Sequence, residues 1–197
     1  KNQVDEFISI YQASVSEKSK EENFQEIKQL EYKVENGLNY RSQMDLLITF
    51  SGANLTKEKF ISLLLYLSQV SITNGEFLAA LDINEKIIGL TNDDRDLINI
   101  VANAHLLIGE IYTRQASWPS SFEFINKALE LFESINDAKG VAKCENLLGT
   151  IYGDFGEVHK AIESFESALS KYDNEKNYSD LGIIEINLGV VNSIKGL

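Results

Sequence analysis

Residues 146–169 read Asn-Leu-Leu-Gly-Thr-Ile-Tyr-Gly-Asp-Phe-Gly-Glu-Val-His-Lys-Ala-Ile-Glu-Ser-Phe-Glu-Ser-Ala-Leu, and this stretch decides the predicted fold. Gly149 would let a second helix approach a first one closely, and Tyr152 would fill the space beside that approach. Gly156 supplies the permissive backbone that a turn needs. No catalytic group stands among these positions, so the stretch predicts a packing unit.

The same pattern recurs at a fixed interval along the chain. Leu148-Gly149 is matched by Ile108-Gly109 before it and by Leu188-Gly189 after it, at equal distances. Two further pairs keep the same spacing: Tyr152 with Tyr112, and Ala168-Leu169 with Ala128-Leu129. A fixed period of this size is typical of a solenoid, in which each helix pair buries its apolar face against its neighbours.

The order of these residues resembles the tetratricopeptide repeat (TPR) family, and the resemblance covers roughly residues 60–197. It implies an all-α fold, a right-handed α-solenoid of antiparallel helix pairs (a TPR-like superhelix). Ala161 and Ala168 would keep the second helix thin where it crosses the first, while Phe165 fills the gap between them. The period of about 40 residues, against about 34 in the commonest form of the repeat, indicates the long variety.

The predicted domain organisation has two parts. Residues 1–55 are expected to form N-terminal helices, either a divergent repeat or a separate cap, and residues 56–197 the repeats. We place the units at about 56–95, 96–137, 138–177 and 178–197, the last truncated before its second helix.

Local signals place several helix boundaries. Apolar residues at helical spacing predict helices near residues 1–15 and 24–36, and a third from Tyr40 to Phe50 that Ser51-Gly52-Ala53-Asn54 breaks. Asn74-Gly75 is expected to turn the chain. Trp118, directly after a predicted turn, is expected to fill the space between repeats rather than stack on a ligand.

Composition excludes several classes of function. Eighteen basic against thirty acidic residues give a net charge of −12, which argues against nucleic-acid and anionic-membrane partners. No apolar run is long enough to span a membrane, and no signal peptide opens the sequence. The single cysteine, Cys144, excludes an internal disulfide and suits a reducing compartment, so a cytoplasmic location is expected.

The sequence offers little for catalysis. His105 and His159 are the only histidines, and no metal-binding, phosphate-binding or nucleophile motif is present. His105 is interpreted as a hydrogen-bonded core or surface histidine, and Cys144 as a packing residue. We therefore predict no enzyme activity, no cofactor and no metal.

The resemblance implies that the first helix of each pair lines a concave groove in which a peptide lies. Residues at spacings of three and four would point into that groove. They are Ser62, Leu65, Gln69 and Ile72; Asn103, Leu106, Glu110 and Thr113; Lys143, Asn146, Thr150 and Gly153; and Ile183, Ile186 and Val190. Asn103 and Asn146 could each donate to and accept from a peptide backbone, because an amide does both. Lys143 would meet a carboxylate, and Glu110 or Arg114 would set a charge preference.

The predicted function is a scaffold that binds a protein or peptide in this groove. The first alternative is a sensory or regulatory domain of a larger bacterial signalling or transcription regulator. The second is a self-assembling module that forms a homodimer through the open C-terminal repeat, where Ile183, Ile186, Val190 and Ile194 would lack a covering helix. The residues that chaperone-tail receptors of this family use are matched here only by Lys143, which argues against that partner.

Overall fold

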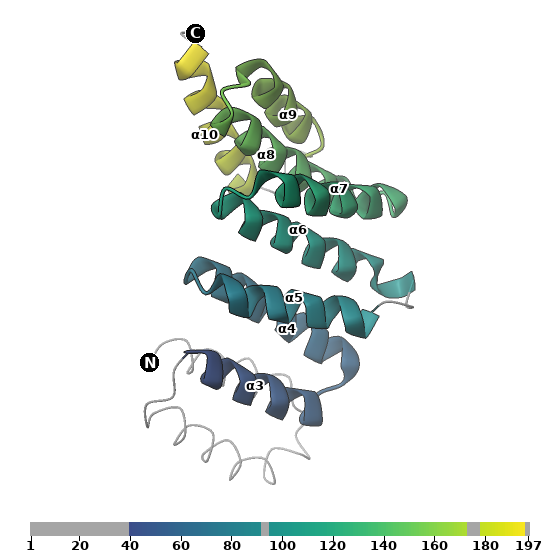
Figure 1. The fold of residues 1–197 in the computed structure, drawn as a ribbon. Coiled ribbons are helices and arrows are strands. Elements are labelled where there is room, and N and C mark those ends of the chain that lie inside the picture. Colours follow the sequence, from purple (N-terminus) through teal and green to yellow (C-terminus); the bar gives the residue numbers. More distant parts are fainter. Residues whose placement is uncertain (1–39, 92–94, 173–177, 196–197) are drawn as a thin grey trace. The chain divides into compact units, whose positions relative to one another are not determined.

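The computed structural model describes residues 40–91, 95–172 and 178–195 (Figure 1). All regular elements of these ranges are helical, which confirms the predicted all-α solenoid class. The helices are α3 (Tyr40–Asn54), α4 (Lys57–Thr73), α5 (Phe77–Thr91), the 3₁₀ turn η2 (Arg95–Leu97), α6 (Ile98–Arg114), α7 (Trp118–Ser134), α8 (Ala138–Asp154), α9 (Val158–Ser170) and α10 (Tyr178–Lys195). The two helices predicted near residues 1–15 and 24–36 lie outside the described residues.

The chain divides into two compact units, residues 1–67 and residues 68–197, with the boundary inside α4. The described part of the first unit consists of α3 and the start of α4. The second unit contains the end of α4 and all later helices, and it carries the candidate site. The repeat boundaries drawn from the sequence remain a prediction.

In the first unit, the prediction that Ser51-Gly52-Ala53-Asn54 breaks a helix was wrong. Helix α3 continues through these residues to Asn54. Ser51 is buried, and a Cβ atom on Gly52 would lie 3.2 Å from the ring of Phe60. The glycine is therefore a contact point for α4 rather than a helix end.

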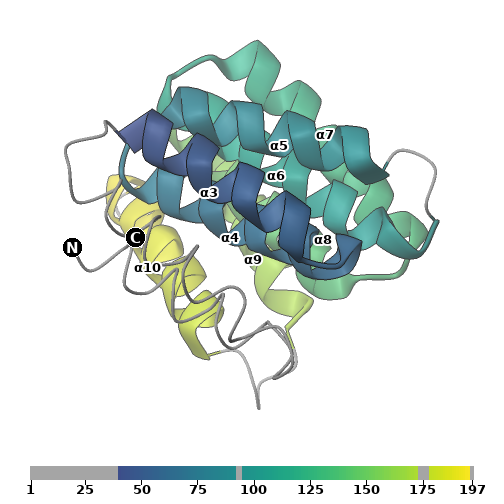
Figure 2. The same ribbon diagram turned by 90° about the horizontal axis from the view of Figure 1, so that it is seen from below.

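In the second unit, consecutive helices pack side by side (Figures 1 and 2). Helices α6 and α7 form one pair and α8 and α9 the next, and α10 packs against both α8 and α9. Helices α6, α8 and α10 begin at residues 98, 138 and 178, so the structure keeps the period of the sequence. We call these three the first helices of their repeats.

Four of the described turns between helices share one geometry. After α8, the amide of Gly156 donates to Gly153 and the amide of Glu157 donates to Tyr152, at 2.9 and 2.8 Å. This pair of bonds is the Schellman motif, which requires a left-handed residue after the helix. Gly156 has φ +74°. Three further turns have the same two bonds, with the left-handed position taken by Gly75, Ala116 and Asn136.

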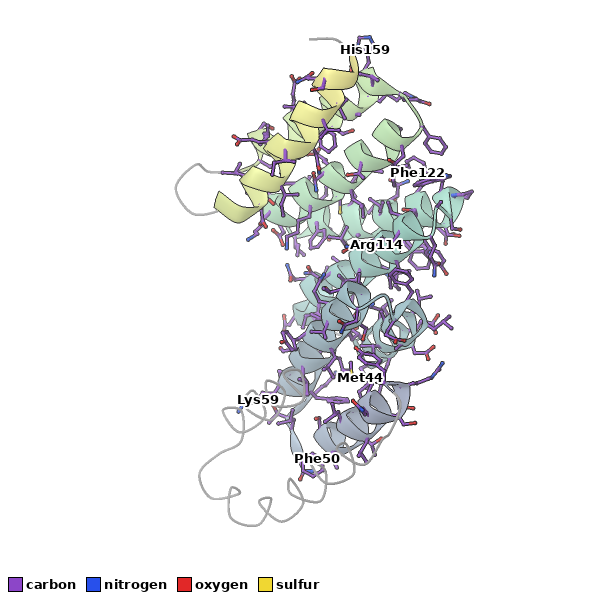
Figure 3. The ribbon with its side chains drawn as sticks, turned by 90° about the vertical axis from the view of Figure 1, so that its left-hand side faces the viewer. Met44, Phe50, Lys59, Arg114, Phe122 and His159 are labelled. Carbon is purple, nitrogen blue, oxygen red and sulfur yellow. The ribbon has the colours of Figure 1, made fainter. Side chains whose placement is uncertain are left out.

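Aromatic side chains join adjacent repeats near the turns. Trp118 opens α7, and its ring centroid lies 5.2 Å from that of Phe155, at the end of α8. Phe122 (Figure 3) stacks on Phe155 at 6.5 Å and lies 5.8 Å from Tyr152. The predicted role of Trp118 as a residue that fills the space between repeats is confirmed.

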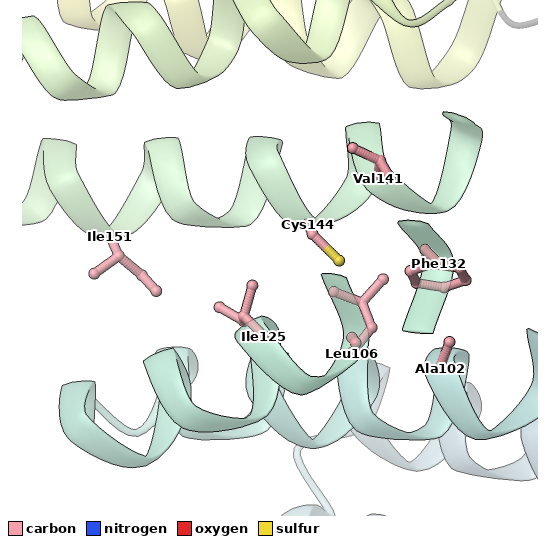
Figure 4. Packing of buried hydrophobic residues seen from close by; sticks show 8 residues of the cluster. Ala102, Leu106, Ile125, Phe132, Val141, Cys144 and Ile151 are labelled. Carbon is pink, nitrogen blue, oxygen red and sulfur yellow. The ribbon is translucent and has the colours of Figure 1, made fainter. Parts of the chain in front are cut away.

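The core of the α6–α7–α8 region is a cluster of buried apolar side chains (Figure 4). Its buried members are Ala102, Leu106, Ile125, Ala128, Phe132, Val141, Cys144 and Ile151. Burying one leucine, isoleucine or phenylalanine side chain stabilises a fold by roughly 1.5–3 kcal/mol. Because the cluster draws on two consecutive repeats, each repeat is stabilised by its neighbour.

Each helix pair has a crossing point formed by two residues that lie 16 positions apart. A Cβ atom on Gly109 would lie 2.7 Å from the Ile125 side chain, and one on Gly149 would lie 2.7 Å from the Phe165 ring. At the end of α4, the corresponding position is Ser68, whose Oγ accepts a hydrogen bond of 2.6 Å from Asn84 Nδ2. The α4–α5 crossing is therefore polar, whereas the two later ones are apolar.

Candidate functional site: the first-helix face

The predicted binding residues lie on α6, α8 and α10, whose neighbouring members contact one another. We use the name first-helix face for nine of the solvent-accessible residues on these three helices. Its members are Asn103, Glu110, Arg114, Lys143, Asn146, Thr150, Ile183, Ile186 and Val190. The structure gives the positions and exposure of these residues, and their contact with a ligand remains a prediction.

On α6 the face is polar and held in place by local bonds. Asn103 Nδ2 donates to the backbone oxygen of Asn99 at 2.7 Å and to its Oδ1 at 3.0 Å. Arg114 donates from Nε and Nη2 to one oxygen of Glu110, at 3.0 and 2.9 Å (Arg114 is labelled in Figure 3). An exposed ion pair of this kind contributes little stability, so both charges can exchange partners at low cost.

On α8 the face offers one cation and one amide. Lys143 is exposed and makes no ion pair with the described residues. Asn146 is half-buried, and its Oδ1 accepts a hydrogen bond of 3.1 Å from Nδ2 of Asn187 on α10. Thr150 donates to the backbone oxygen of Asn146 at 3.1 Å. The amide of Asn146 is thus oriented by its neighbour, with its own Nδ2 group left to donate elsewhere.

On α10 the face becomes apolar. Ile183, Ile186 and Val190 are 51%, 67% and 56% exposed. These three are the exposed large apolar side chains in the described part of α10, and they lie within two turns of one another on its surface. The side chain of Ile194, predicted to be uncovered as well, lies outside the described ones.

Two residues predicted to line the groove are buried instead. Ile72 is 1% exposed and packs with Ala80 and Ile111, and Leu106 is 9% exposed and belongs to the core cluster around Cys144. The prediction was wrong for both, because a neighbouring helix covers their side of the first helix. Spacings of three and four do not distinguish that side from the open one.

The structure also shows where the predicted packing positions lie. Ala128, Ala161, Phe165 and Ala168 are buried, and Tyr112 and Tyr152 are half-buried beside aromatic neighbours. Gly109 and Gly149 have a side chain of the second helix against them, whereas a Cβ atom on Gly189 would meet nothing within 4 Å. Gly189 therefore keeps the glycine of the repeat pattern, but no side chain of a second helix lies against it as at Gly109 and Gly149.

Three residues that the sequence analysis did not single out connect adjacent repeats or helices. Asn187 orients Asn146, and Asn99 Nδ2 donates to Asp137 Oδ2 at 2.7 Å. A Cβ atom on Gly140 would lie 2.1 Å from the ring of Phe132. The position of Asn99 recurs as Lys139, which forms an ion pair of 3.1 Å with Asp180. The repeat period therefore marks a polar position on the first helix, but it does not identify the partner, since Asp137 and Asp180 are not equivalent positions.

Burial shifts the pKa of two side chains outside the first-helix face, Cys144 and His105. Burial raises the pKa of Cys144 to about 12, so its thiol is protonated and unreactive at neutral pH. Burial, and then Lys127, lower the pKa of His105 from its ordinary value of 6.5. The predicted hydrogen bond of His105 was wrong for Nδ1, which has no partner among the described residues. No group of three or more His, Cys, Asp or Glu residues suited to a metal occurs in the described ranges.

The helix pairs, the fixed repeat period and the glycine crossings together identify the fold. Residues 100–174 match the tetratricopeptide repeat family. Over these residues the chain has the sequence pattern of tetratricopeptide repeats. None of the described helices is both long and apolar enough to cross a membrane.

Two known proteins are similar to the chain, one in sequence and one in structure. It is 34% identical over 94 residues to the transcriptional activator NprA of Geobacillus stearothermophilus, a match that covers 48% of the chain and 23% of that relative. The chain thus spans about a quarter of the relative's length. The crystal structure of BtubC (BKLC) from P. vanneervenii is similar with a TM-score of 0.62 and 17% identity, over 98% of this chain and 84% of that one. At that identity the likeness concerns the fold alone.

Proposed function

We propose that the first-helix face recognises a protein or peptide partner without catalysis. The observation that carries this proposal is the alignment of oriented, partly exposed polar groups on consecutive first helices. Asn103 and Asn146 occupy α6 and α8, each held by one neighbouring amide. Lys143 stands exposed three residues before Asn146.

These groups suit an extended peptide because its backbone offers donors and acceptors at regular intervals. An amide side chain can satisfy both kinds of group at once. The exposed apolar side chains of α10 would take an apolar residue of the same ligand, and Lys143 would take a carboxylate. The cost of ordering these side chains is reduced where they are already held, as at Asn146.

A regulatory role is the second proposal, supported by the similarity to a transcriptional activator. In this role the repeats would sense a ligand for a larger protein. The single buried cysteine suits a reducing compartment, so the cytoplasm is the proposed location. A homodimer through α10 is the third proposal, supported by its exposed apolar side chains.

The test of the first proposal is selection of binders from a displayed library of random short peptides, followed by affinity measurement with variants. Asn146→Ala and Lys143→Ala should each weaken a selected peptide by about tenfold, which is about 1.4 kcal/mol. Lys86→Ala, an exposed cation on α5, is the matched control and should leave affinity unchanged.

The same two variants test whether the face has been assigned to the correct side of the helices. Because Asn146 and Lys143 lie outside the core clusters, urea unfolding should change by no more than about 1 kcal/mol. If either variant unfolds the chain, or if all selected peptides bind independently of both residues, the proposed face is in the wrong place. Light scattering of the unliganded chain separately tests the homodimer.

A further inference from the structure

A second surface, distinct from the first-helix face, lies at the turn between α8 and α9 and is centred on Phe155. This residue directly follows the last residue of α8 and is 49% exposed. Two rings of α7 pack against it. The Trp118 centroid lies 5.2 Å away, and the Phe122 ring lies 6.5 Å away at an interplanar angle of 5°. Phe155 therefore presents an oriented aromatic ring to solvent.

Elsewhere in the second unit, a lysine lies over an aromatic ring in two places. Lys127 Nζ is 4.8 Å from the centroid of the Phe124 ring, and Lys160 Nζ is 5.4 Å from that of Tyr152. A cation within about 6 Å of a ring centroid is attracted by the electron-rich face of the ring. Exposed rings of this chain thus attract cations where the chain supplies them.

In both places a carboxylate holds the cation. Lys127 forms an ion pair of 2.6 Å with Glu123, and Lys160 forms an ion pair with Glu157. Each group therefore consists of a ring, a cation over it and a carboxylate paired with the cation. We call such a group a cation–ring–carboxylate trio.

The turn after α8 has the ring and the carboxylate of such a trio without the cation. Asp154 directly precedes Phe155, is exposed, and forms no ion pair with the described residues. None of the described lysines and arginines lies over the Phe155 ring. The next cation along the chain, Lys160, is already engaged by Glu157 and Tyr152. A cation at Phe155 would therefore come from outside the described part of the chain.

We propose that Phe155 and Asp154 bind an arginine side chain on the surface of a partner protein. A guanidinium is planar, so it stacks on an aromatic ring while its N–H groups donate to a carboxylate. Trp118 and Phe122 keep their packing role and fix the orientation of the Phe155 ring. The partner supplies the cation that the two complete trios take from the chain itself.

The charge of the chain favours a basic partner over a second copy. Thirty acidic and eighteen basic residues give a net charge of −12. The resulting field attracts cationic segments and opposes the approach of an identical chain. At the turn itself, Glu157 is neutralised by Lys160, whereas the charge of Asp154 is not balanced by any described residue. The local and the overall charge therefore select the same kind of partner.

The direct test follows Trp118, because it is the single tryptophan of the chain and its ring contacts Phe155. An acetylated and amidated pentapeptide with one arginine between two pairs of glycines is titrated into the intact chain, and the indole N–H resonance of Trp118 is recorded by NMR. We expect a saturable shift of this resonance. The same peptide with citrulline in place of arginine keeps the shape without the charge, and it should bind at least about threefold more weakly.

Two variants remove the two components of the surface separately. Phe155→Leu keeps an apolar side chain without the aromatic face, and Asp154→Asn removes the charge at nearly constant shape. Each should weaken binding of the arginine peptide by about threefold while the helical circular dichroism stays unchanged. Glu130→Gln, an exposed carboxylate elsewhere on α7, is the matched control and should leave the affinity unaltered.

Several outcomes would overturn the proposal. They are the absence of a saturable shift, equal binding of the citrulline peptide, and binding of the arginine peptide that is insensitive to Phe155→Leu. A dimer in light scattering that Phe155→Leu dissociates would also contradict it, because a second copy would then occupy the surface. Lys143→Ala, on the first-helix face, should leave the shift unchanged, which separates this surface from the proposed peptide site.

Discussion

The α4–α5 and α8–α9 crossings use the same positions for opposite chemistry. In both, the contacting residues lie 16 positions apart, but Ser68 meets Asn84 through a buried hydrogen bond and Gly149 meets Phe165 through van der Waals contact. The first arrangement gives a directional bond between two helices, while in the second a large ring lies within 2.7 Å of where a Cβ atom on Gly149 would be.

The comparison teaches that the repeat specifies a geometry rather than a residue. Removing the partner of a buried donor or acceptor costs roughly 1–3 kcal/mol. Asn84 Nδ2 donates to Ser68 Oγ at 2.6 Å and to the backbone oxygen of Ala80 at 2.9 Å. The polar crossing is therefore intolerant of losing either side chain alone, and the apolar crossing is intolerant of added volume.

The largest expected effect comes from adding volume to the apolar crossing with Gly149→Leu. The new side chain would overlap the Phe165 ring, so α8 and α9 would have to separate. We expect a loss of about 1–3 kcal/mol in the free energy of unfolding, measured by urea titration. Gly189→Leu is the control, because the equivalent position of α10 is open. Equal stability of the wild-type and Gly149→Leu chains would contradict the close contact.

An intermediate effect is expected when the polar crossing is converted to the apolar kind. Ser68→Gly with Asn84→Ile copies Gly109 and Ile125. Each single change should destabilise the chain by about 1–2 kcal/mol, since it leaves a buried polar group without its partner. The double variant should be more stable than the sum of the two losses predicts. A double-mutant cycle by urea unfolding measures this coupling, and strict additivity would show that the two residues do not act as a pair.

The smallest expected effect is on the pH dependence of stability, and it comes from His105 and Lys127, which occupy the positions of Glu145 and Ser167 one repeat earlier. Where α8 and α9 have Glu145 bonded to Ser167, α6 and α7 have His105 beside Lys127. The folded chain holds the pKa of His105 below 6.5, so the unfolded chain binds more protons there as the pH falls. Stability contributed by neutral His105 is present above pH 6.5 and is lost as the pH falls through the folded pKa.

Thermal unfolding across this pH range checks the assignment. The loss of stability on acidification should be smaller in His105→Gln than in the unaltered chain. Lys127→Ala should also reduce it, because Lys127 adds to the lowering. His159→Gln is the control, as His159 is exposed on α9. An unchanged pH profile in His105→Gln would assign the acid sensitivity to the carboxylates instead.

Much of the second unit could be predicted from sequence because its signals are local and repeated. The repeat period located α6 to α10, and the glycines and alanines marked the crossings. The extent of α3 was missed because Gly52 also suits a turn, and only the position of Phe60 shows that it is a contact. Polar residues can be placed on a helix from spacing alone, but their exposure depends on neighbouring helices.

In the candidate site, too, some residues could be placed from the sequence and others could not. Asn146 and Lys143 were placed on an accessible face, while Ile72 and Leu106 proved to be core residues. The bond between Asn187 and Asn146 could not be predicted, because it joins two helices across 41 residues. Equivalence between repeats identifies which positions face one another, and the structure determines which of them form bonds.

The shared turn geometry has a consequence for how such a chain can evolve. Gly75, Ala116 and Gly156 occupy the same left-handed position, one in each of three consecutive repeats, and each turn is closed by the same two backbone bonds. Since those bonds use the main chain and each of these turns lies inside a repeat, a repeat that is duplicated carries its own turn with it. The array can therefore change length in single units, and a new binding surface can arise in an added copy while the parent copy keeps its own.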